Sequence, residues 1–205
     1  MSSTIDDRTD EIAREAARLL AAGREEDVAR AVRSAAGALG YGDAPRPRPG
    51  HVRRHLQGRA LEALGEHGYR AMVHATWRLA EELLTAIEYG VAGARALLVG
   101  RAARGHIDGG VTLHVRVYGD APIGRIAEVL VEQGYEEPTF ETAVARCGRL
   151  DRIRFVEDGR AVVVTRCPPG ADRGADRDLD LFTGRRIETA DAARLRAQLG
   201  RGGSG

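Results

Sequence analysis

The stretch LLVGRAARGHIDGGVTLHVRV, residues 97–117, decides how this chain folds. It opens with a short apolar run and continues into a turn that carries four glycines. At its end, apolar side chains alternate with Thr112, His114 and Arg116. A short, wholly apolar run is typical of a strand buried on both faces, and period-two alternation is typical of a strand with one polar face. We therefore predict two strands joined by a glycine turn at Gly100.

Toward the C-terminus, the sequence predicts a helix, a hairpin and a second helix. IGRIAEVLVEQGY, residues 123–135, has helical periodicity and a glycine that can end the helix. DRIRFVEDGRAVVVTR, residues 151–166, contains Asp158-Gly159, a dipeptide typical of two-residue hairpin turns. The remaining predicted elements are a polar loop at 167–178, a short apolar segment at 179–182, a helix at 189–199 capped by Thr189 or Asp191, and a disordered tail at 201–205.

Toward the N-terminus, the periodicity is helical. Residues 9–39 carry two apolar stripes separated at Gly23, and Thr9 or Asp10 can cap the first helix. APRPRPG, residues 44–50, predicts an extended linker because alternating prolines forbid a helix. A second helical region runs from His51 to about Tyr89, with a break at Gly65 or Gly68.

These elements predict an α/β (α+β) protein, in which a mixed sheet is covered by helices and preceded by a helical region. The predicted organisation is an N-terminal helical segment at 1–43, a linker at 44–50, a helical region at 51–94, an α/β core with its C-terminal helix at 95–200, and the tail at 201–205.

Composition narrows the chemistry. All 31 basic residues are arginine, and neither lysine nor asparagine occurs, which excludes Schiff-base, P-loop and asparagine-dependent catalytic sites. The formal net charge of +1 gives no general attraction to nucleic acid or to an anionic membrane.

Cys147 and Cys167 lack the pattern of a catalytic thiol and cannot form a structural zinc site unaided. Neither a signal-peptide core nor a long apolar run occurs, so we expect a cytoplasmic protein with reduced thiols and no membrane partner.

The order strand, glycine turn, strand, helix, hairpin resembles the minimal nucleotidyltransferase fold of the polymerase-beta-like superfamily. Val99-Gly100-Arg101 stands where that family has an apolar residue followed by Gly and then Gly or Ser. Ten residues later, Thr112-Leu113-His114-Val115 stands where the family has two carboxylates that alternate with apolar residues. The resemblance covers about residues 79–198.

The resemblance implies a magnesium-dependent transfer site, but the sequence departs from it at the metal ligands. Thr112 and His114 replace the two carboxylates and cannot supply the anionic oxygens that Mg²⁺ prefers. AVVVTR, residues 161–166, offers no third carboxylate. We therefore expect a catalytically degenerate member of the fold that needs no cofactor.

What remains at the predicted site is cationic. Arginine grips phosphate through a planar fork of donors, so we hypothesise a protein that binds a nucleotide or another phosphorylated ligand. The predicted ligand-binding residues are Gly100, Arg101, Arg104, Thr112, His114 and Arg116. Arg152 and Arg154 share one face of the hairpin strand and would add to the cleft if the two faces converge.

Three alternatives stay open. Asp178 and Asp180 form a carboxylate–apolar–carboxylate pair that could hold Mg²⁺ in an active nucleotidyltransferase, with His114 as a general base. The chain could instead be an interaction module with an empty cleft, in which the N-terminal helices drive homo-oligomerisation. Basic residues near the linker offer a contact face for nucleic acid: Arg46, Arg48, Arg53, Arg54 and Arg59.

The histidines provide one further motif. His51 and His55 in HVRRH stand four residues apart on a predicted helix, the spacing of two-histidine zinc sites. The glutamate of that motif is missing, and the neighbouring arginines repel a dication. His67 and His74 also share a helix face. We expect all four to be ordinary surface or core histidines and predict no metal site.

Overall fold

The computed structural model describes residues 3–22, 24–25, 27–107, 112–171 and 175–201. They form two compact units, and the boundary along the chain lies between Arg70 and Ala71. The N-terminal unit holds the described residues up to Arg70 together with Ile107, and the C-terminal unit holds the others. This boundary falls inside the stretch 51–94, which we predicted to be one helical region. Residues 202–205 of the predicted tail lie outside the described residues.

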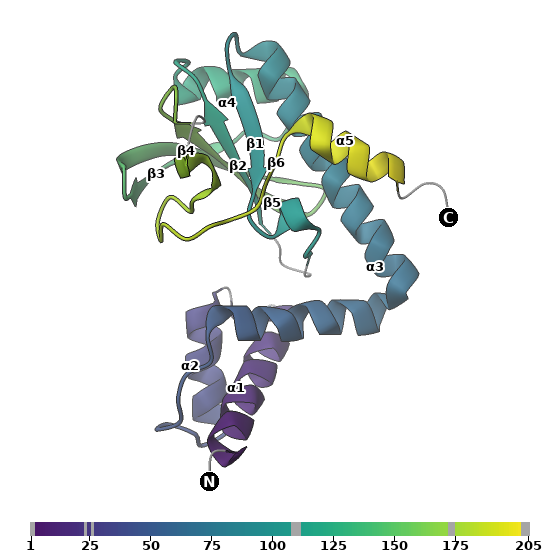
Figure 1. Cartoon of the computed structure of the whole chain (residues 1–205), viewed down its shortest axis with the longest axis vertical. Coiled ribbons are helices and arrows are strands. Elements are labelled where there is room, and N and C mark those ends of the chain that lie inside the picture. Colours follow the sequence, from purple (N-terminus) through teal and green to yellow (C-terminus); the bar gives the residue numbers. More distant parts are fainter. Residues whose placement is uncertain (1–2, 23, 26, 108–111, 172–174, 202–205) are drawn as a thin grey trace. The chain divides into compact units, whose positions relative to one another are not determined.

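The N-terminal unit is built from two short helices and the first part of a long one. The helices are α1 (Ser3–Ala21), α2 (Val28–Ala38) and α3 (Pro49–Gly90). Helices α1 and α2 lie side by side (Figure 1). Their core is mostly alanine, which lets helix backbones approach closely. The buried residues are Ile12, Ala13, Ala16, Ala17, Ala31, Val32, Ala35, Ala36 and Val52.

The proline-rich segment before α3 packs within the N-terminal unit. Pro47 is buried. The hydroxyl of Thr9 on α1 donates a hydrogen bond to the carbonyl oxygen of Pro45 at 3.3 Å. Pro49 begins α3, where the missing N–H of proline leaves no helical bond unmade. The predicted extended linker therefore joins α2 to α3 inside one unit.

Helix α3 bends at Gly65, one of the two predicted break points. Gly65 has φ 66° and ψ 172°, a left-handed conformation that favours glycine. Beyond the bend, the helix buries one apolar face in the C-terminal unit, formed by Leu79, Leu83, Leu84 and Ile87.

The C-terminal unit contains a six-stranded mixed sheet of order β3-β4-β5-β2-β1-β6. The strands are β1 (Arg95–Val99), β2 (Leu113–Tyr118), β3 (Thr139–Ala145), β4 (Gly148–Glu157), β5 (Arg160–Cys167) and β6 (Thr189–Ala190). Neighbouring strands are antiparallel except β2 and β5, which are parallel. The other elements are α4 (Ile123–Glu132), α5 (Ala192–Arg201) and the short 3₁₀ turns η1 (Ala102–Arg104) and η2 (Ala175–Asp178). The predicted α/β fold class is confirmed.

The two faces of the sheet differ in character. One face carries the buried residues Ala96, Leu98, Leu113, Val115, Val117, Ile153, Phe155, Val162 and Val164. Tyr135, which follows α4, meets Phe155 edge-on with ring centroids 5.9 Å apart. Helix α4 therefore covers this apolar face. The opposite face, called the polar face below, carries His114 and Arg116 of β2 and Arg152 and Arg154 of β4.

The hairpin between β4 and β5 turns where the sequence predicted. Asp158 and Gly159 have φ angles of 49° and 70°, both left-handed, as the favoured two-residue hairpin turn requires. The predicted cap of the first helix is wrong, because α1 begins at Ser3 and places both Thr9 and Asp10 inside the helix.

Strands β3 and β6 were not predicted. Strand β3 exposes Phe140 and Val144 by 62% and 76%, so no buried apolar run marks it in the sequence. Strand β6 has only two residues, and Thr189 belongs to it. The cap of α5 is therefore Asp191, whose Oδ1 accepts a hydrogen bond from the N–H of Arg194 at 2.9 Å.

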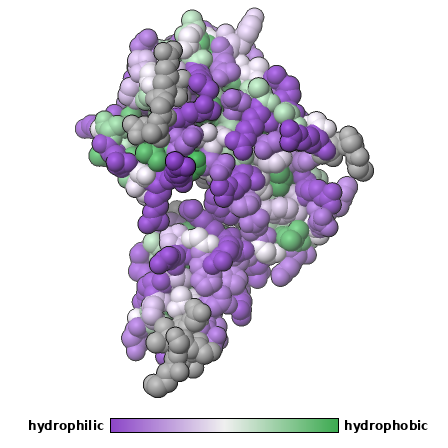
Figure 2. Space-filling view, in the orientation of Figure 1, coloured by the Kyte–Doolittle hydropathy of each residue, from purple (hydrophilic) through white to green (hydrophobic). Residues whose placement is uncertain are grey.

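Within the described residues, every helix is too short or too polar to cross a bilayer. The molecular face seen in Figure 2 is mostly hydrophilic, with small and separate hydrophobic patches.

Candidate functional site

The polar face brings together side chains from three adjacent strands. Arg116 of β2 pairs with Thr165 of β5, and Thr165 pairs with Arg152 of β4. The Cα atoms of the two arginines are therefore about 10 Å apart, which is two strand spacings, with Thr165 between them. His114 and Arg154 lie one pleat away on the same face. The strand registers thus place these four charged or titratable residues on one face, which meets the condition that we set for Arg152 and Arg154 to add to the cleft.

Arg116 is the most unusual of these residues because its charge is buried and has no direct ion pair among the described residues, although it lies near enough to Asp180 to lower the pKa of that carboxyl. It is 3% exposed. Its Nη1 donates to the carbonyl oxygen of Arg177 at 3.3 Å, and its Nε has no hydrogen-bond partner in the described part of the chain. Arg152, by contrast, lies 3.0 Å from Glu141, although its Nε is likewise buried without a hydrogen bond among the described residues.

The segment that follows β5 covers the polar face beside Arg116. A small apolar cluster joins Leu97, Val99, Tyr118 and Cys167 to Ala171, Leu181 and Ile187. We predicted a cationic cleft if the strand faces converge, and the segment after β5 covers part of the common face beside Arg116. The cover explains why Arg116 is buried while His114, two residues earlier on the same strand, is exposed.

Asp178 and Asp180 do not form the strand pair that the enzyme alternative requires. Asp178 ends η2, and its Oδ1 accepts a hydrogen bond from the hydroxyl of Thr189 at 3.1 Å. Oδ1 of Asp180 accepts hydrogen bonds from the N–H of Phe182 at 3.1 Å and from the N–H and hydroxyl of Thr183 at 2.6 and 2.8 Å. These bonds close a turn, so this oxygen of Asp180 has a structural role.

The charge balance around Asp180 agrees with that role. Burial tends to raise its pKa, but the hydrogen bonds from Thr183 and Phe182 and the nearby charge of Arg116 outweigh burial, and the pKa is lowered. Within the described ranges, neither Asp178 nor Asp180 belongs to a group of three side chains spaced to hold a metal ion.

The glycine turn after β1 is cationic but partly neutralised. Gly100 has φ 83°, and its N–H donates to the carbonyl oxygen of Glu188 at 2.8 Å. Arg104 forms an ion pair with Glu188, and its hydrogen bond is the chief reason that the pKa of Glu188 is lowered. Arg104 therefore has a carboxylate partner where we predicted a phosphate contact. Arg101 directly precedes η1.

Contacts with α3 hold the turn in place. Nε1 of Trp77 donates to the carbonyl oxygen of Ala102 at 2.8 Å. Gly105 has φ 76°, and a Cβ atom there would lie 2.8 Å from the Trp77 ring, so only glycine fits.

Burial, followed by the charges of Arg101 and Arg104, lowers the pKa of His106. Thr112 lies just before β2 and is half-buried; Gly109 and Gly110 lie outside the described residues.

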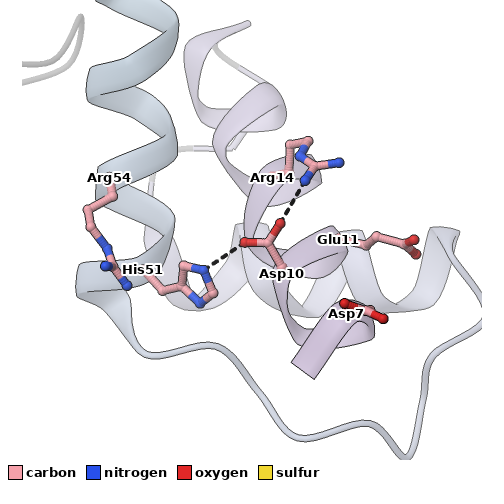
Figure 3. Close-up of a pocket in the computed structure, with 6 residues that line it drawn as sticks. All are labelled: Asp7, Asp10, Glu11, Arg14, His51 and Arg54. Carbon is pink, nitrogen blue, oxygen red and sulfur yellow. Dashed lines mark hydrogen bonds and ion pairs between the residues drawn. The ribbon is translucent and has the colours of Figure 1, made fainter. Parts of the chain in front are cut away.

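A second cluster lies in the N-terminal unit, and sequence analysis missed one of its members. His51 and His55 on α3 both face Asp10 on α1, and each Nε2 lies 2.8 Å from Oδ1 of Asp10. The two imidazole rings stack with centroids 5.4 Å apart. Arg14 binds the other oxygen, Oδ2, at 2.7 Å (Figure 3). We call Asp10, His51 and His55 the Asp10–His cluster.

Both histidines are about three-quarters buried, and the carboxylate is about one-third exposed. The hydrogen bond from His55 is the largest cause of a lowered pKa at Asp10; burial opposes it, and the bond from His51 and the charge of Arg14 add to it. A signal for Asp10 was present in the sequence. It stands three and seven residues before the buried Ala13 and Ala17, so it extends the buried stripe of α1 by one turn.

The remaining candidates stand apart from both clusters. His67 is exposed on α3, and His74 stacks on Trp77 with ring centroids 6.2 Å apart. Cys147 is exposed and Cys167 is buried. Burial raises the pKa of the Cys167 thiol to about 11, which keeps it protonated near neutral pH.

Comparisons with protein-family models, curated proteins and solved structures found no match to this chain. What the protein does is therefore inferred from its own residues.

Proposed function

We propose that the C-terminal unit binds a nucleotide or another phosphorylated ligand on its polar face, as a catalytically degenerate protein of nucleotidyltransferase-like fold. The observation that carries this proposal is the buried charge of Arg116, whose one hydrogen bond within the described part of the chain goes to a carbonyl oxygen. A buried charge without a counter-ion is costly, and an anion that docks against it removes that cost.

The neighbours of Arg116 suit a phosphate group. Arg152 lies across Thr165 on the same face, and its Nε is also buried without a hydrogen bond among the described residues. Guanidinium groups bind phosphate through paired N–H donors, so two such groups on either side of a hydroxyl form a suitable cradle. Glu141 competes for Arg152, so the ligand must outweigh one ion pair.

The proposed degeneracy follows from the residues at the expected metal positions. Thr112 and His114 replace carboxylates, and Asp180 accepts the hydrogen bonds of its own turn. A hard cation such as Mg²⁺ prefers several carboxylate or water oxygens, so we propose that phosphate binding depends on arginine and needs no metal.

A thermal-shift panel tests this proposal. The full chain is melted with ATP, pyrophosphate or inorganic phosphate, each with Mg²⁺ or with a chelator. A ligand that binds only the folded state raises the melting temperature as its concentration rises. We expect a rise that the chelator does not abolish. A shift that requires Mg²⁺ would favour the active enzyme, and no shift with any probe at high excess would favour the interaction module.

Matched variants locate the site. Arg116→Met and Arg152→Met keep side-chain length and remove the charge, and each should reduce the ligand-induced shift. Arg125→Met is the control, because Arg125 lies on α4 and, among the described residues, forms ion pairs with Glu128 and Glu132. Ligand shifts of equal size in Arg116→Met and in the unmodified chain would contradict the proposal. Arg101→Met measures any contribution of the glycine turn.

A further inference from the structure

We propose that Asp10, His51 and His55 form a binding site for a divalent transition metal, with Zn²⁺ as the best-fitting ion. This inference concerns the N-terminal unit and does not rest on phosphate binding by the C-terminal unit. It reverses our expectation that the two histidines hold no metal, because the structure supplies a carboxylate ligand 41 residues away from His51 in the sequence.

The donor atoms already converge. Nε2 of His51, Nε2 of His55 and Oδ1 of Asp10 all lie within 4.8 Å of one another. Around a tetrahedral zinc ion with bonds of about 2.0–2.2 Å, ligand atoms lie about 3.3 Å apart. The present N···O distances of 2.8 Å therefore need to widen by only about half an ångström. Such a change is within the reach of side-chain rotation.

The chemistry of the donor set selects the class of ion. Two imidazole nitrogens and one carboxylate oxygen suit zinc and the neighbouring late first-row ions, whereas Ca²⁺ and Mg²⁺ prefer sets made only of oxygen. Each histidine would bind through the Nε2 lone pair and keep its proton on Nδ1. Three protein ligands leave the fourth position of a tetrahedral zinc ion for water.

The surroundings hold the ligands in place. The buried core residues Ile12, Ala13 and Val52 lie one to three positions from the ligands on the same two helices, so the ligands stand on packed elements. Arg14 binds Oδ2 of Asp10, which leaves Oδ1 as the oxygen aimed at the histidines. A partner of this kind on the second carboxylate oxygen is the usual way in which a metal ligand is oriented.

A cavity beside the cluster provides room for the water ligand. Its volume is about 530 Å³, and its lining residues are Asp7, Asp10, Glu11, Arg14, His51 and Arg54 (Figure 3). In this lining, the three carboxylates outnumber the two arginines. The repulsion of a dication that we predicted from the flanking arginines is therefore offset by acidic residues contributed by α1.

Metal titration tests the proposal. The full chain, without a polyhistidine tag and stripped with a chelator, is titrated with Zn²⁺ by calorimetry and with Co²⁺ by visible absorption. We expect about one ion per chain, binding at micromolar concentration or tighter, and Co²⁺ bands of the intensity typical of four ligands. No saturable binding of either ion would overturn the proposal and leave a hydrogen-bonded cluster only.

Variants assign the ligands. His51→Ala, His55→Ala and Asp10→Asn should each weaken Zn²⁺ binding by more than tenfold, because loss of a direct ligand costs at least as much as loss of a supporting residue. Asp10→Asn keeps the shape of the side chain, and circular dichroism verifies that each variant is folded. His67→Ala is the matched control, since His67 is an exposed histidine of the same helix. Unchanged affinity in His51→Ala and His55→Ala would overturn the proposed ligand set.

Discussion

The two polar clusters of the molecule differ in how neighbouring groups balance the charge at their centre. In the N-terminal unit, His51, His55 and Arg14 all point at the single carboxylate of Asp10. In the C-terminal unit, Arg116 is more deeply buried, yet the hydrogen bond that it makes to the described residues goes to a neutral carbonyl oxygen. The first cluster has several donors for one anion; in the second, among the described residues, the buried cation has no direct ion pair and only the nearby charge of Asp180.

This difference is the reason for proposing a cation as the ligand of the first cluster and an anion as the ligand of the second. Two imidazole nitrogens that converge on a carboxylate oxygen can exchange their shared protons for a metal cation. In the part of the chain that the structure describes, Nε of the buried Arg116 has no hydrogen bond, so an anion that reached it would supply an acceptor. The same comparison predicts that removing the central charge has opposite effects on stability in the two units.

Asp10→Ala should have the larger effect and should destabilise the protein. It leaves both histidines and Arg14 without their shared acceptor, and we expect a loss of about 2 kcal/mol in the free energy of unfolding. Urea denaturation of the chelator-treated protein measures this value. Asp7→Ala, an exposed position on the same helix, is the control and should change it by less than about 0.5 kcal/mol. Equal losses in the two variants would show that the cluster contributes nothing to folding.

Arg116→Met should stabilise the ligand-free protein, because it replaces a buried charge with an apolar side chain of similar length. We expect a gain of about 1 kcal/mol, since the loss of the hydrogen bond to the carbonyl of Arg177 and of the attraction to the Asp180 carboxylate offsets part of the benefit. Arg154→Met, on the same face but 53% exposed at the side chain, should change stability little. A marked loss of stability in Arg116→Met would mean that the arginine holds the covering segment in place, and the comparison between the two units would fail.

Local patterns in the sequence predicted the polar side of each strand, but not the parallel pairing of β2 with β5 that joins the two sides. The alternation predicted which side chains of β2 share a face, and Asp158-Gly159 predicted the hairpin that pairs β4 with β5. What the pattern could not show is burial, because the cover comes from residues beyond β5. Arg116 therefore has the sequence signature of a solvent-facing strand residue although it is 3% exposed.

The Asp10–His cluster shows a second limit. The spacing of His51 and His55 is visible in the sequence, but their partner Asp10 lies on another helix. The residues around Asp10 were equally consistent with a helix cap, and the structure places Asp10 inside α1 instead. Only the packing of α1 against α3 decides between the two roles. Strand β3 escaped prediction for a related reason, since its pairing with β4 is set by tertiary context and its own apolar residues face solvent.

The smallest predicted effect is the acid dependence of the Asp10–His cluster. The pKa of Asp10 is lowered from its ordinary value of 3.8, chiefly by the hydrogen bond from His55 and against the effect of burial. A carboxylate whose pKa is lower in the folded state binds fewer protons there than in the unfolded chain. Its contribution to stability is therefore complete above the ordinary pKa and is lost as the pH falls through the folded value.

The comparison of Asp10→Asn with the unmodified chain isolates this contribution, because asparagine keeps the acceptor oxygen and removes the charge. The difference between their unfolding free energies should be constant just above pH 5 and should shrink as the pH falls below about 4. Urea denaturation in metal-free buffer at a series of pH values measures it. A difference that stays constant down to pH 3 would mean that the charge of Asp10 does not stabilise the cluster. Hydrogen-bond geometry alone would then hold the cluster, and the charge of Asp10 would contribute less to the binding of a metal cation.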